Sequence, residues 1–173
     1  MKVVTNFGEK APGAEIVSLE LAKENSNIDY AYRDELFNLY LSGVETEIEN
    51  YIGFPVLFRD QVEITVNVWD KQVQFAVPVN EVTGVHWVDA NNIQTEITEY
   101  DFFANEVSID MEKPSGFKRL KITCSAGYAA SEVPGDIKSA ALLMFSERET
   151  YRENRPLKFN LSAQNLLRPY KLY

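Results

Sequence analysis

The sequence has one cysteine and one histidine in 173 residues, which excludes most sites that depend on either side chain. A lone Cys124 cannot form an internal disulfide, and one cysteine with one histidine cannot build a tetrahedral zinc site. His86 is the only base available for a Ser-His-Asp or Cys-His arrangement, and it lies in a predicted strand beside Trp87. We therefore interpret His86 as a structural or surface residue, and we expect neither a metal nor a cofactor.

Long apolar runs and phosphate-binding motifs are also missing. No stretch approaches the roughly 20 apolar residues that span a bilayer, and the first 16 residues lack the pattern of a signal peptide. We expect synthesis in the cytoplasm. Neither a glycine-rich phosphate loop nor a dinucleotide motif is present, and Cys124 alternates with Leu120 and Ile122 as a buried residue would. The sequence predicts no enzyme; a catalytic site of unrecognised type is the less favoured hypothesis.

Positive charge is scarce, because 17 Lys and Arg residues face 26 Asp and Glu residues, for a net charge of -9. Such a surface repels nucleic acid, so we do not expect sequence-specific DNA binding. The charge is uneven: the predicted helix before Gly53 is acidic, and the C-terminal part is basic. One interpretation is two solvated helix faces, and the other is a contact between the acidic helix of one copy and the basic end of the next. The residues of this interface hypothesis are Glu45, Glu47, Glu49, Arg148, Arg152 and Arg155.

What is present is a change of hydrophobic period along the chain. Residues 1–17 predict an extended arm, and residues 18–53 predict two helices, the longer with Leu36, Tyr40, Val44 and Ile48 on one stripe. Between about 57 and 125 the apolar residues alternate, which predicts an antiparallel sheet or a small sandwich. A long helix should follow Pro134, and a short terminal turn should end near Leu167. The prediction is an α+β fold: one domain over 18–173, with helical parts at 18–53 and 134–167 framing the inserted sheet.

Taken in order, these segments resemble the head-tail connector (adaptor) proteins of tailed bacteriophages, in the version with a β insertion between helices. The opening helices end in Tyr51-Ile52-Gly53-Phe54-Pro55, similar to the family's opening. The other segments that carry the resemblance are Pro78 to Val85 leading to Tyr100-Asp101-Phe102, Ile122 to Tyr128 followed by the helix after Val133-Pro134, and the closing Leu166-Leu167-Arg168-Pro169-Tyr170.

The resemblance implies a structural virion protein at the head-tail junction, made in the bacterial host. It would form a homo-oligomeric ring, dodecameric in the virion, between the portal protein and the tail or its completion proteins. DNA would pass through the lumen without being read. The closing segment of Leu166, Leu167, Arg168, Pro169 and Tyr170 is the expected contact with a partner. The alternative is a tail-completion or other protein-binding module of a phage or prophage.

Overall fold

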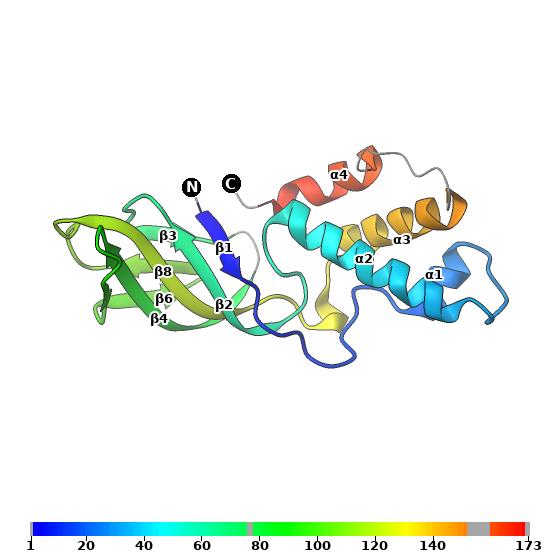
Figure 1. The fold of residues 1–173 in the computed structure, drawn as a ribbon, viewed down its shortest axis with the longest axis horizontal. Helices are drawn as coiled ribbons and strands as arrows, with labels where there is room; N and C mark the ends of the chain where they lie inside the picture. The colour runs from blue at the N-terminus through cyan, green and yellow to red at the C-terminus, as the bar shows by residue number, and fades with distance from the viewer. Residues whose placement is uncertain (1, 76–77, 152–159, 172–173) are drawn as a thin grey trace.

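The computed structural model describes residues 2–75, 78–151 and 160–171. Within them the chain forms helices at one end and antiparallel strands at the other end of an elongated molecule (Figure 1), which confirms the predicted α+β fold. The helices are α1 (Leu19–Asn25), α2 (Asp34–Ile52), α3 (Gly135–Thr150) and α4 (Leu161–Leu167), with 3-10 turns η1 (Ala130–Glu132) and η2 (Arg168–Tyr170). The strands are β1 (Lys2–Asn6), β2 (Arg59–Val66), β3 (Gln72–Gln74), β4 (Val79–Asp89), β5 (Gln94–Glu96), β6 (Tyr100–Phe103), β7 (Glu106–Ile109) and β8 (Phe117–Ala126).

The helices pack around a shared apolar core. Helix α2 ends at Gly53, whose φ of 78° is the left-handed conformation that glycine adopts without strain. The buried face of α2 includes Phe37, Val44 and Ile48, whereas Leu36, which we expected on this stripe, is exposed. The rings of Phe37 and Phe145 meet edge to face at 5.7 Å between centroids, joining α2 to α3. The expected stripe was thus one residue out of phase at its start.

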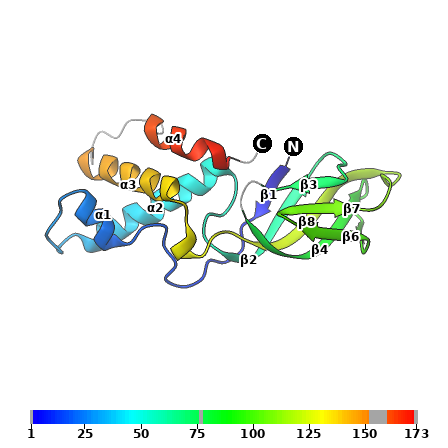
Figure 2. The same ribbon diagram turned by 180° about the vertical axis from the view of Figure 1, so that it is seen from behind.

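The strands form two antiparallel sheets. The larger has the order β1-β2-β8-β4-β5 and the smaller the order β3-β7-β6. In the larger sheet, β8 pairs with both β2 and β4, so that Ile122 lies opposite Ile64 on one side and Val85 on the other. Alternate residues of β8 are buried, as the period of two predicted. Figure 2 shows β6 and β7 on the side nearest the viewer, lying over the larger sheet.

The segment before residue 18, which we expected to be an extended arm, is joined to the rest of the chain. Its strand β1 pairs with β2 at the edge of the larger sheet, and Lys10 forms an isolated bridge with Arg59. Further along, Ile16 and Val17 are buried in the core. The division into an arm and a single domain from 18 to 173 stays a prediction.

The two ends of the molecule meet where the chain crosses between them. Leu57 and Tyr128 form a parallel bridge, and the Tyr128 amide donates to the Val56 carbonyl at 2.8 Å. Gly127 has a φ of 105°, and a Cβ there would lie 2.5 Å from the Leu57 carbonyl oxygen. The crossing strands therefore approach too closely for any side chain at position 127.

Candidate functional site

The two residues with reactive chemistry occupy structural positions. Cys124 is fully buried in β8, and burial raises the pKa of its thiol to about 12, so that it stays protonated at neutral pH. His86 lies half-buried in β4, opposite Glu96 of β5 and Lys121 of β8. Among residues 2–75, 78–151 and 160–171, no group of three His, Cys, Asp or Glu side chains is placed to hold a metal ion. The candidate functional sites are therefore surfaces and charged clusters.

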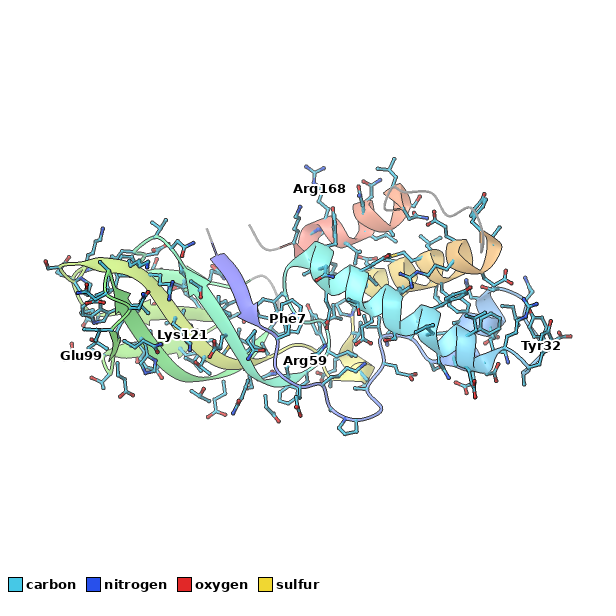
Figure 3. The ribbon with its side chains drawn as sticks, in the orientation of Figure 1. Phe7, Tyr32, Arg59, Glu99, Lys121 and Arg168 are labelled. Atoms are coloured by element: carbon cyan, nitrogen blue, oxygen red, sulfur yellow. The ribbon has the colours of Figure 1, made fainter. Side chains whose placement is uncertain are left out.

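Two of the predicted acidic residues point toward the sheets. Glu49 is only 5% exposed, and its carboxylate accepts hydrogen bonds from the Val56 amide at 3.0 Å and from the Arg59 guanidinium at 2.9 Å. Glu45 accepts a hydrogen bond from Lys10 at 2.7 Å and lies 4.0 Å from Arg59. These four charged residues form a cluster, here called the junction cluster, which ties α2 to β2 and to the N-terminal segment. Figure 3 shows Arg59 between the helical and the β end.

The junction cluster is poorly hydrated, and this affects the ionisation of Glu45. Its burial raises the pKa of the Glu45 carboxyl above the usual value, and the hydrogen bond from Lys10 opposes that rise. The hydrogen bonds of Glu49 with Arg59 and the Val56 amide, and of Glu45 with Lys10, thus hold the helical end against the sheet and the N-terminal segment. The geometry of the cluster indicates a structural role, because it joins two parts of the chain.

A separate ion pair joins α2 to α3. Arg148 lies 2.9 Å from Glu47 and donates to the Tyr40 carbonyl at 3.0 Å. Its guanidinium passes over Gly43, where a Cβ would collide with it. The predicted acidic and basic residues that the structure describes are thus paired within one chain. Arg152 and Arg155 lie outside the described residues, and a contact of these groups between copies stays a prediction.

The closing segment is partly internal. Leu167 is fully buried, and Leu166 and Tyr170 pack against the core, whereas Arg168 and Pro169 are exposed. Burial raises the pKa of the Tyr170 hydroxyl, and the nearby Asp136 carboxylate adds to the effect. Arg168 projects away from the molecule at the end of α4 (Figure 3). Of the five residues predicted to contact a partner, Arg168 and Pro169 are the ones a partner could reach most readily.

The sequence did not reveal that the exposed positions of α2 between residues 39 and 50 are all uncharged. Glu45, Glu47 and Glu49 have partners in the chain and are partly or fully buried. The exposed positions from 39 to 50 are Leu39, Ser42, Thr46 and Asn50. Beside these positions lies a groove of about 440 Å³, counted to its open mouth. The groove is lined by residues of the N-terminal segment, α2 and α3, among them Lys10, Glu15, Ile16, Val17, Leu41 and Ser42. The spacing of 42, 46 and 50 was a visible signal, but the groove depends on how the N-terminal segment folds back.

Comparison with known proteins gives structural likeness without sequence relatives. No family model matches the sequence, and no curated protein matches it. A chain in the solved structure "Neck of empty GTA particle computed with C6 symmetry" superposes with a TM-score of 0.67 at 18% identity, over 100% of this chain and 96% of the other. A chain of "Virion of native gene transfer agent (GTA) particle" gives 0.63 at 18% identity, over 100% and 96%. A chain of "Neck of native GTA particle computed with C12 symmetry" gives 0.60 at 17% identity, over 95% and 94%. At these identities the likeness shows a shared fold.

Proposed function

We propose that this chain is a structural subunit of the ring that connects head to tail at the neck of a phage-type particle. The observation that carries the proposal is the superposition on a neck chain over the full length of one protein and 96% of the other. A superposition of this extent includes the helices, both sheets and the crossing between them. The match is therefore to the whole architecture, which the sequence pattern had also indicated.

The charge of the chain suits a ring through which DNA passes. A net charge of -9 per copy repels phosphates, so the DNA would slide past without being held. The proposed role needs no catalytic step, and the inert Cys124 thiol agrees with it. Its partners would be further copies of the chain, a portal protein above the ring and a tail or tail-completion protein below it.

Two contacts belong to this proposal. The exposed Arg168 and Pro169 at the end of α4 are candidates for contact with the portal or tail partner. The acidic α2 of one copy and the basic C-terminal part of the next are candidates for contact within the ring. Since Glu47 and Arg148 already pair within one chain at 2.9 Å, the second contact would have to use or exchange an existing ion pair.

The test is electron microscopy of the purified chain, alone and mixed with a candidate portal protein from the same genome. We expect closed rings of twelve or six copies, the symmetries in which the similar neck structures were computed. A chain that stays monomeric under both conditions, and binds no portal protein, would refute the connector role. Binding to a tail protein without ring formation would instead support a tail-completion module.

A further inference from the structure

The β6–β7 turn holds a large aromatic side chain out in solvent. Phe103, the last residue of β6, is 82% exposed, the highest value among the exposed large apolar residues of the described chain. Full hydration of an aromatic ring is unfavourable, and burial in an interface would recover that free energy. Aromatic side chains of this kind are often the anchors of protein contacts.

The turn that carries Phe103 is firmly held in an unfavourable backbone conformation. Ala104 and Asn105 have φ values of 49° and 65°, a region that residues with a Cβ seldom adopt. The Asn105 side chain accepts from the Val79 amide at 2.7 Å and donates to the Phe75 carbonyl at 2.7 Å. The Phe75 amide in turn donates to the Asn105 carbonyl at 3.1 Å. Three hydrogen bonds thus fix the turn, and a fixed turn loses little entropy when Phe103 binds.

The groove beside α2 could receive such a side chain. Its apolar lining comes from Ile16, Val17, Leu41, Val44 and Ala141, and a space of about 440 Å³ is large enough for one aromatic ring. Lys10 and Glu45 in its wall pair at 2.7 Å, which leaves Glu15 as the groove's exposed charge at the rim. An uncharged ring would enter without separating an ion pair.

Helix α2, which forms one wall of the groove, and the β6–β7 hairpin, which carries Phe103, face opposite sides of the molecule (Figure 1 and Figure 2). Helix α2 is on the side nearest the viewer in Figure 1, and β6 and β7 are on the side nearest the viewer in Figure 2. A contact between two different patches is heterologous, and it can close into a ring when each copy uses both. When copies lie side by side in a ring, each copy needs the two contacting patches on opposite sides.

The two proposed surfaces carry few charged side chains. Copies that each carry a charge of -9 repel one another, so an interface costs least where exposed charge is absent. The outer face of α2 beside the groove is uncharged, and Thr46 already donates its hydroxyl proton to the Ser42 carbonyl at 3.0 Å. Residues 102–105 of the turn are likewise uncharged, and the charged residues Asp101 and Glu106 flank them.

We infer that Phe103 of one copy inserts into the groove between α2 and residues 10–17 of the next copy. This rests on the proposed ring, for which it supplies the contact between neighbours. The occupant is a second copy of this chain, and the uncharged face of α2 packs around the inserted turn.

Two single substitutions and one control test the contact. Phe103→Ala removes the aromatic side chain, and Ser42→Trp fills the groove from an exposed position. Each substitution should raise the protein concentration at which half of the chains are assembled, by at least about tenfold in mass photometry. Ile93→Ala is the control, because Ile93 is 61% exposed but lies in another turn, and it should leave assembly unchanged. Thermal unfolding of each variant establishes that it folds.

A disulfide trap gives a second readout. In the Phe103→Cys, Ser42→Cys double variant, mild oxidation should give a reducible ladder of covalent oligomers. Neither single variant should be cross-linked, because the inferred contact joins position 103 to position 42. The native Cys124 is fully buried and should not contribute.

The outcomes separate the inference from the proposed function. Suppose that the wild type forms rings. If Phe103→Ala then assembles as the wild type does, or the double variant gives no ladder, the inference is overturned and the connector role is left intact. Phe103→Ala rings that form normally but no longer bind the portal protein would assign Phe103 to that partner and also overturn it. A wild-type chain that forms no ring, alone or with the portal protein, would contradict both the inference and the proposed function.

Discussion

At the scale of single residues, Gly43 in the middle of α2 leaves room for the Arg148 side chain that crosses it. The Arg148 guanidinium occupies the space of a Cβ at position 43, and there it reaches Glu47 and the Tyr40 carbonyl. In an open helix, alanine would stabilise by up to about 1 kcal/mol relative to glycine. Here the alanine would displace a largely buried cation from its partners, and hydrogen bonds to charged groups contribute about 1.5–3 kcal/mol.

We therefore expect Gly43→Ala to lower the free energy of unfolding by about 1–2 kcal/mol in urea titrations. Gly135→Ala is the matched control, since Gly135 begins α3 with nothing within 4 Å of an added Cβ. That variant should be neutral or slightly stabilised. Equal stability of the two variants would show that Arg148 gives way without loss, and that its contacts with α2 contribute little.

At the scale of elements, the junction cluster fixes α2 against β2. Glu49→Gln removes a buried charge whose oxygens bond Arg59 and the Val56 amide, and the buried guanidinium would keep only the Glu45 carboxylate, 4.0 Å away, as a counter-ion. Breaking a buried pair in this way costs about 3–5 kcal/mol. We expect a loss near about 3 kcal/mol in the free energy of unfolding, because the glutamine amide oxygen still accepts one bond.

Glu112→Gln is the control for this substitution. Glu112 also pairs with a cation, Lys71, at 2.8 Å, but the Glu112 side chain is 92% exposed, so solvent screens the pair. Denaturant titration should show no measurable change for it. If both glutamine variants unfold at the same denaturant concentration, the junction cluster does not hold the two ends of the molecule together.

Element positions followed from the sequence where periodicity was long and clean. Helix α2 was predicted from its apolar spacing, and its end from Gly53, because both signals are local. The destinations of Glu45 and Glu49 were not predictable in this way. Their partners Lys10 and Arg59 belong to other elements, and a carboxylate inside a charged cluster has the same sequence signature as one in water.

At the scale of the whole molecule, strand order and the groove depended on contacts between distant residues. Alternation predicted that residues 57–125 form strands, but it did not give the pairing of β8 between β2 and β4 or the separate sheet of β3, β7 and β6. The N-terminal segment showed no periodicity, yet it supplies β1 and one wall of the groove. The resemblance in segment order indicated the architecture, and the superposition on neck chains agrees with it at the level of fold.

The salt dependence of assembly distinguishes the two contacts considered for the ring. If uncharged surfaces meet between copies that each carry a charge of -9, added salt screens their repulsion. We then expect the protein concentration at which half of the chains are assembled to be lower at about 0.5 M than at about 0.05 M salt, as measured by sedimentation velocity. Glu15→Gln, which removes a charge at the groove rim, should flatten this dependence. Assembly that weakens with salt would contradict this, because it is the behaviour of attraction between the acidic α2 and the basic C-terminal part.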